Sequence, residues 1–288
     1  MNWRNEGAKQ FERLAVHPFP ARMAPTIALK AVSGCRRRLT VLDPMSGSGT
    51  VVVAARAKGH YAIGVDLDPL AVLLSKVWCT SINKSAIRKK ASMVLIRACR
   101  RLPSERNSYP QNADAETKKF IRYWFDIYAR RQLASLANSI AKCRDSDCRD
   151  VLWCAFSRLI ITKQAGSSLA IDLAHSRPHK YFKRAPIKPF ESFLKSVDRV
   201  LDNCLSSTEK QRGPASRIKN GDARRLRIPN SSIDLVLTSP PYLNAIDYLR
   251  CSKFSLVWMG FNIQELRRIR SNAVGTEVGD YDNLDKNK

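Results

Sequence analysis

The stretch LTVLDPMSGSGTVVVAARA, residues 39–57, decides the fold of this chain. It begins with the apolar run 39–43, continues as the glycine-rich turn 44–50 and ends in the helix-like run 51–57. A strand, a glycine-rich turn and a helix in this order open a nucleotide-binding α/β unit. Glycine in such a turn lets the backbone approach a ligand closely. The stretch therefore predicts a ligand-binding turn between a buried strand and a helix.

A second strand is expected directly downstream, at residues 60–66, where HYAIGVD ends in an acid. A carboxylate at this place in a nucleotide-binding unit accepts hydrogen bonds from ribose hydroxyls. The spacing from Gly49 to Asp66 is close to the usual one for such units. Asp66 is therefore our candidate for holding a ribose.

A third signal follows the apolar run 233–238, which predicts another strand and leads into Ser239-Pro240-Pro241-Tyr242. Proline fixes φ and removes an amide donor, and it keeps the residue before it extended. The turn is therefore stiff, with a hydroxyl and outward carbonyl groups beside an aromatic ring. Such a cluster of acceptors suits a planar group that carries an NH2, as a nucleobase with an exocyclic amine does.

Together these stretches resemble the motifs of S-adenosylmethionine-dependent amino-methyltransferases of DNA. Residues 43–50 look like the family's DPxxGSGT motif, and residues 64–69 look like its next motif. Residues 221–223 and the TSPPY sequence at 238–242 resemble the third and fourth, and HPFP at 17–20 resembles a motif that precedes the glycine loop. Serine before Pro-Pro-Tyr is typical of the cytosine-N4 branch, whereas the adenine-N6 branch more often has aspartate. The resemblance covers residues 11–80 and 215–260.

The resemblance implies a set of site residues and S-adenosylmethionine as cofactor. The glycine loop would lie against the methionine part, with Asp43 near the amino group, Asp66 at the ribose and Asp222 at the adenine amine. The full set implied for the cofactor is His17, Pro18, Asp43, Ser46, Gly47, Gly49, Thr50, Asp66, Asp222 and Thr238. The catalytic set is Ser239, Pro240, Pro241 and Tyr242. No metal site is expected.

The chemistry of an exocyclic amine indicates what the catalytic turn does. The nitrogen lone pair of cytosine is delocalised into the ring, so acceptors for its N–H bonds favour a nucleophilic, more tetrahedral nitrogen. The Ser239 hydroxyl and the Pro240 carbonyl are the expected acceptors, and Tyr242 is expected to stack on a base flipped out of duplex DNA. No cysteine follows a proline as carbon-5 methylation requires, which argues against that reaction.

Composition agrees with a nucleic-acid partner. Fifty Lys plus Arg residues against 25 Asp plus Glu give a net charge of +25. Such an excess favours a polyphosphate partner whose binding weakens with salt, although a generic basic surface is the alternative. We expect no transmembrane helix and no secretory signal, hence a cytoplasmic location. The 8 cysteines form no CxxC pair, which favours reduced thiols over a zinc site.

We expect an α/β fold with a Rossmann-like class I methyltransferase sheet that carries a helical insertion. Residues 1–82 are predicted to hold an N-terminal segment and the first half of the cofactor-binding domain. Residues 83–215 are predicted to form the mainly helical insertion, which either recognises the DNA target or caps the cofactor. Residues 216–288 are predicted to hold the second half with the TSPPY turn. Within the insertion, residues 176–181 combine basic residues, histidine and tyrosine in a proline-stiffened loop that could hold phosphates or a base.

The sheet is expected to be incomplete on its C-terminal side. The family sheet has further strands after the Pro-Pro-Tyr turn, whereas residues 247–260 and 263–271 read as helices here. A sheet that stops at its fourth strand exposes an apolar edge, which a second chain or a homodimer would cover. Three functions stay open: a DNA cytosine-N4 methyltransferase, an RNA-base or adenine-N6 methyltransferase, and a non-catalytic or split nucleic-acid-binding subunit.

Overall fold

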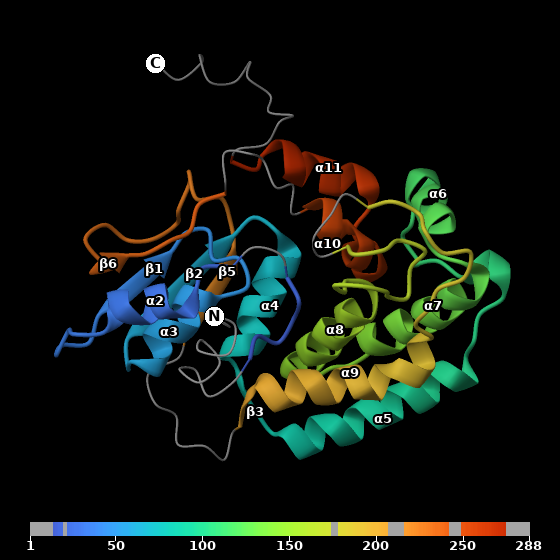
Figure 1. Cartoon of the computed structure of the whole chain (residues 1–288), viewed down its shortest axis with the longest axis horizontal. Helices are drawn as coiled ribbons and strands as arrows, with labels where there is room; N and C mark the ends of the chain where they lie inside the picture. The colour runs from blue at the N-terminus through green and yellow to red at the C-terminus, as the bar shows by residue number, and fades with distance from the viewer. Residues whose placement is uncertain (1–13, 20–21, 174–177, 207–215, 242–248, 275–288) are drawn as a thin grey trace.

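A parallel β-sheet forms the centre of the fold. The computed structural model describes residues 14–19, 22–173, 178–206, 216–241 and 249–274. The sheet strands are β1 (Thr40–Asp43), β2 (Tyr61–Asp66), β5 (Ser216–Asn220) and β6 (Leu235–Val236). All pair in parallel, in the order β5-β2-β1-β6 (Figure 1). The chain thus moves outward from β1 to β5 and returns to the other side of β1, which confirms the predicted Rossmann-like α/β fold.

Helices pack against the strands that they connect. They are α2 (Pro25–Val32), α3 (Thr50–Ala57) and α4 (Pro69–Cys79). Helix α3 contacts β1 and β2, and α4 contacts β2 and β5. The apolar residues of 51–55 on α3 are all buried, because this short helix lies between the sheet and α2. The helix predicted at 51–57 is confirmed as part of α3.

A helical unit lies beside the sheet (Figure 1). Its helices are α5 (Lys84–Arg100), α6 (Ala115–Trp124), α7 (Ile127–Ala141), α8 (Ser146–Ile160) and α9 (Pro189–Asn203), with the short η1 (Glu105–Asn107). Helices α5, α7, α8 and α9 contact one another, and α8 also contacts α4. The predicted helical character of this region is therefore confirmed.

Aspartate or asparagine side chains cap the N-termini of five helices. The side chains of Asp68, Asn83, Asp114, Asp126 and Asp145 each accept a hydrogen bond from a backbone N–H in the first turn of α4, α5, α6, α7 or α8. Such N-caps satisfy amide donors that have no partner inside the helix. The sequence therefore sets these helix starts locally.

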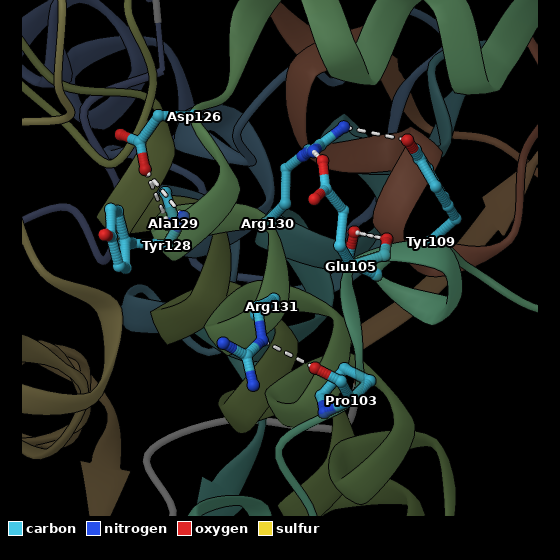
Figure 2. A network of polar contacts seen from close by, with 9 residues as sticks. Pro103, Glu105, Tyr109, Asp126, Tyr128, Ala129, Arg130 and Arg131 are labelled. Carbon is cyan, nitrogen blue, oxygen red and sulfur yellow. Dashed lines mark hydrogen bonds and ion pairs between the residues drawn. The ribbon is translucent and has the colours of Figure 1, made fainter.

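Buried Arg130 fastens the segment after α5 to α7 (Figure 2). Its guanidinium donates to the Tyr109 hydroxyl at 2.8 Å and pairs with Glu105 at 3.3 Å. The Nε of Arg131 donates to the carbonyl oxygen of Pro103 at 2.6 Å. Because Arg130 and Arg131 both donate to the segment after α5, this side of α7 has a structural role.

A second, two-stranded ladder was not foreseen. β3 (Ser81–Ile82) pairs in parallel with β4 (Leu205–Ser206). It joins the start of the helical unit to its end, next to the sheet. Strands of two residues are too short to show an alternation of apolar and polar residues, so no pattern in the sequence predicts them.

Two helices follow the turn after β6. They are α10 (Leu249–Leu256), extended by η2 (Val257–Met259), and α11 (Ile263–Ser271). The helices expected at 247–260 and 263–271 are confirmed over these described parts, and residues 249–274 contain no strand. Over the described ranges no helix has the length and apolarity that a membrane crossing needs.

The last sheet strand is shorter than predicted. The run 233–238 was expected to be a strand, but the ladder of β6 spans only Leu235 and Val236. Single backbone bonds continue on both sides, from Asp234 N to Thr40 O at 3.0 Å and from Leu237 N to Leu42 O at 2.9 Å. Among the described strands β6 pairs only with β1, and Val236 is 57% exposed.

All eight cysteines are free thiols.

Candidate active site

The candidate site lies where the carboxyl ends of the four sheet strands meet. Asp43 ends β1, Asp66 ends β2, Asp222 follows β5, and Thr238 follows β6. Because all strands are parallel, these ends share one edge of the sheet. The strand order reverses between β1 and β6, and ligands of open α/β sheets bind at such a reversal.

The glycine loop is held against α4 at one point and open at another. Gly49 has φ +95°, and a Cβ there would lie 2.8 Å from Ser75 Oγ and 3.1 Å from Ser75 Cα. The Ser75 hydroxyl donates to Gly47 O at 2.8 Å. A Cβ on Gly47 would meet nothing within 4 Å, so the loop has an open side there.

Three hydroxyls of the loop are buried: those of Ser46, Ser48 and Thr50. The Oγ atoms of Ser46 and Ser48 have no hydrogen-bond partner within the described part of the chain. Buried polar groups normally find a partner, so these atoms point to a ligand or water at the loop. The loop thus combines open space with unused polar groups.

Asp66 supports the loop and keeps acceptor capacity. Its Oδ2 accepts from Gly47 N at 2.7 Å, and its Oδ1 accepts from Asp68 N at 2.9 Å. A carboxylate offers about four lone-pair sites, so two bonds leave room for hydroxyl donors. Burial raises the pKa of Asp66 above its ordinary value, although the backbone donors oppose this shift.

Asp43 joins the glycine loop to the Pro-Pro turn across the sheet. Its Oδ1 accepts from Thr238 Oγ1 at 2.7 Å and from Met45 N at 3.2 Å. Within the described residues no donor reaches Oδ2. Burial raises the pKa of Asp43 to about 6, and the bonds from Thr238 and Met45 limit the rise. The structure therefore brings together two motifs that lie 195 residues apart.

The turn itself projects from this edge. Ser239 and Pro240 are exposed, and Pro241 is half-buried. The acceptors predicted on Ser239 and Pro240 are thus open to an incoming group. Tyr242 lies outside the described residues, so its stacking role stays a prediction.

Asp222 has a partner that the sequence analysis did not foresee. Arg224 donates from Nε to Oδ1 at 3.0 Å, and its terminal nitrogen lies 2.7 Å from Oδ2. The Arg224 guanidinium lowers the pKa of Asp222. An adenine amine would therefore share this carboxylate with Arg224. The proposed role of Asp222 stays a prediction.

His17 lies against the helical unit. Its Nε2 is 3.0 Å from Ser157 Oγ on α8, and that oxygen is 2.9 Å from Ser255 Oγ on α10. Burial, followed by the charge of Arg158, lowers the pKa of His17 well below its ordinary value, so the ring is neutral. Pro18 beside it is half-buried. Within the described contacts neither touches the glycine loop, and their cofactor role stays a prediction.

Asp68 and Ser252 form a buried link that the sequence analysis missed. Asp68 Oδ1 accepts from Leu70 N at 2.8 Å, and its Oδ2 accepts from Ser252 Oγ at 2.6 Å. Burial raises the pKa of Asp68 to about 7. The Asp-Pro pair signals a helix start, but nothing in the sequence marks Ser252. The link fixes α10, the helix after the Pro-Pro turn, to the start of α4.

Comparison with known proteins finds Type II methyltransferases. The chain is 25% identical over 279 residues to the Type II methyltransferase M.MvaI of Kocuria varians, covering 88% of this chain and 59% of the relative. It is 21% identical to M.MjaII of Methanocaldococcus jannaschii, with 81% and 59% covered. It is 20% identical to M.BsoBI of Geobacillus stearothermophilus, with 83% and 50% covered. No family model and no solved structure matches the chain.

These similarities support the predicted relationship with DNA methyltransferases. They do not distinguish the cytosine-N4 branch. The chain spans about half to three fifths of the length of the relatives that it matches.

Proposed function

We propose that this chain carries the cofactor site and the catalytic turn of an S-adenosylmethionine-dependent methyltransferase that modifies N4 of cytosine in DNA. The observation that carries the proposal is the bond from Thr238 Oγ1 to Asp43 Oδ1 at 2.7 Å. It sets the serine-proline turn beside the glycine loop at the carboxyl edge of the sheet. Similarity to Type II methyltransferases supports the reaction class.

The residues at the loop fit S-adenosylmethionine. Gly47 offers open space, Asp43 Oδ2 is available for an ammonium group, and Asp66 keeps acceptor capacity for ribose hydroxyls. The unpartnered hydroxyls of Ser46 and Ser48 are suited to a polar ligand. When bound, this cofactor supplies an electrophilic methyl group.

The turn prepares the nucleophile. The Ser239 hydroxyl and the Pro240 carbonyl accept the N–H bonds of the target amine, which concentrates the lone pair on nitrogen. The methylated amine would carry an additional proton that water can accept, so the chain needs no strong base. Serine at this place, as in the cytosine-N4 branch, favours cytosine over adenine.

Further polypeptide beside β6 belongs to the same proposal. Val236 is 57% exposed on a strand whose described neighbour is β1 alone. Parallel sheets are normally buried on both faces, and unpaired edges bind other strands. We therefore expect a second chain, or a second copy, to pair along β6 and complete the active sheet.

The direct test is methyl transfer from labelled S-adenosylmethionine to duplex DNA, followed by digestion and identification of the modified nucleoside. N4-methylcytosine supports the proposal, and N6-methyladenine moves the target to the other branch. Transfer to RNA but not to DNA rejects the DNA substrate. Absence of transfer both alone and with a partner chain indicates a non-catalytic subunit.

Replacing Asp66 by alanine is expected to raise the dissociation constant for S-adenosylmethionine at least about tenfold. A hydrogen bond to a charged group contributes about 1.5–3 kcal/mol, and the variant also frees Gly47 N. Calorimetry measures the affinity. Asp198→Ala is the matched control, because that carboxylate pairs with Arg88 on distant helices α9 and α5. Equal affinity in both variants removes the role of Asp66.

Replacing Ser239 by alanine is expected to lower turnover on the order of 10²-fold, with little change in cofactor affinity. The reason is that the hydroxyl meets the target amine and not the cofactor. Ser232→Ala is the control, since its hydroxyl donates to Pro229 O before the same strand. Turnover of Ser239→Ala equal to that of the control would show that this hydroxyl takes no part in the reaction.

A further inference from the structure

Three exposed tyrosines lie on the helical unit together with cations. Tyr123 is 55% exposed, Tyr128 62% and Tyr181 68%. Lys180 Nζ lies 5.1 Å from the centroid of the Tyr123 ring, and Arg184 Cζ lies 5.8 Å from that of Tyr128. We call Tyr123, Tyr128, Lys180, Tyr181, Lys183 and Arg184 the tyrosine–cation surface.

The backbone of the loop that carries these cations is already fixed. Leu169 N donates to Trp124 O at 2.8 Å, and Tyr181 N donates to Leu169 O at 2.9 Å. Ala185 N donates to Asp126 Oδ2 at 2.7 Å. These bonds tie the loop to the end of α6 and to the start of α7. The ring–cation contacts, which contribute about 0.5–1 kcal/mol at exposed sites, are therefore not needed to order it.

The two sides of α7 differ in what they do. Figure 2 shows Asp126 and Tyr128 in its first turn, on the opposite side from Arg130, which points to Glu105 and Tyr109. The terminal nitrogens of Arg130, on the inner side, both donate to protein partners. Tyr128 on the outer side faces solvent.

The local charge is strongly positive. Residues 178–188 contain Lys180, Lys183, Arg184 and Lys188 and no acid. Exposed Lys118, Lys119 and Arg122 lie on α6 nearby, where Glu116 pairs with Arg267. Both carboxylate oxygens of Asp126 accept hydrogen bonds from backbone amides. A cation that rests on an exposed ring stays accessible to an anion, and a tyrosine hydroxyl donates readily to phosphate.

A short path of contacts connects this surface to the candidate active site. The Tyr123 and Trp124 rings are 4.9 Å apart, and the Trp124 and Phe254 rings are 5.0 Å apart. Phe254 lies on α10, two residues from Ser252, which bonds to Asp68. The surface thus adjoins the helix that follows the catalytic turn.

We infer that the tyrosine–cation surface binds the sugar–phosphate backbone of the duplex DNA that flanks the target base. The inference rests on the proposed function, because the DNA is its substrate. The surface fixes register and orientation through phosphate contacts, which carry no base information. The cations are held ready on rings, so little side-chain freedom is lost when phosphate binds.

The test compares two triple variants with equal change of charge. The first is Lys180→Gln, Lys183→Gln and Arg184→Gln. The control is Lys30→Gln, Arg36→Gln and Lys58→Gln, three exposed cations on the segments that lead into the amino ends of β1 and β2. Affinity for a duplex oligonucleotide is measured without cofactor over a range of salt concentrations, and circular dichroism checks the fold.

The slope of log K against log salt is expected to become less steep by about 2–3 in the first variant, since each phosphate contact contributes about 0.9. The control is expected to keep most of the slope of the parent. Equal changes in both variants, an unchanged slope in the first, or a parent that does not bind duplex DNA overturns the inference. Binding is read separately from methyl transfer. Loss of slope in a chain that transfers no methyl group, either alone or with a partner chain, therefore upholds this surface and rejects the proposed enzyme, and methyl transfer with an unchanged slope does the reverse.

Discussion

Replacing Gly49 with alanine lowers the free energy of unfolding by about 2–5 kcal/mol. Gly49 has φ +95°, a left-handed conformation that costs an L-residue about 1–2 kcal/mol. The added methyl would also lie 3.1 Å from the Ser75 backbone, and overpacking costs about 1–3 kcal/mol. Ser75 is fully buried and its hydroxyl holds Gly47 O, so neither partner can move freely.

Urea unfolding of Gly49→Ala and Gly59→Ala separates these two causes. Gly59 has φ +83°, and nothing lies within 4 Å of an added Cβ, so it shares the backbone strain without the crowding. The control is expected to lose about 1–2 kcal/mol. Equal midpoints for the two variants would show that contact with Ser75 does not hold the glycine loop.

The elements of this fold were predictable where the signal is local. The glycine loop follows from residues 44–50, and the helix starts follow from caps such as Asp126 and Asp145. The Rossmann-like α/β sheet was also expected, because a resemblance across several motifs implies it. The shortened β6 was not, since its apolar run continues beyond the two residues that pair with β1.

The sequence motifs predicted which residues belong to the site. They did not predict the hydrogen bonds that connect these residues. Asp43, Asp66 and Thr238 were expected in one cofactor site, and the structure places all three at one edge of the sheet. The links between Thr238 and Asp43 and between Ser252 and Asp68 span 195 and 184 residues. No periodicity connects positions so far apart. For the same reason the fork of Arg224 on Asp222 and the contact of His17 with Ser157 were not foreseen.

Asp68→Ala and Asp68→Asn are expected to differ widely in stability. Alanine removes the N-cap of α4, which contributes about 1 kcal/mol, and leaves the Ser252 hydroxyl buried without its acceptor, at about 1–3 kcal/mol. Its free energy of unfolding should fall by about 2–4 kcal/mol. Asparagine keeps both contacts, because its oxygen can accept from Leu70 N and its NH2 can donate to Ser252 Oγ.

The pH dependence distinguishes the buried acid from a simple cap. Burial raises the pKa of Asp68 to about 7 from the ordinary 3.8, so between these values the folded state holds more protons than the unfolded state. Stability from this group therefore falls as the pH rises through that window, by at most about 1.4 kcal/mol per pH unit. Asparagine does not titrate. Urea unfolding at pH 5 and pH 8 should therefore show that the free energy of unfolding of Asp68→Asn, relative to that of the parent, is higher at pH 8 than at pH 5. Asp43 is present in both proteins, whereas the charge of Asp66 also raises the pKa of Asp68, so the difference between the proteins includes this coupling. The opposite result would be a free energy of unfolding that rises with pH in the parent relative to Asp68→Asn. It would show that the folded state stabilises the ionised carboxylate of Asp68, so that burial does not dominate its pKa.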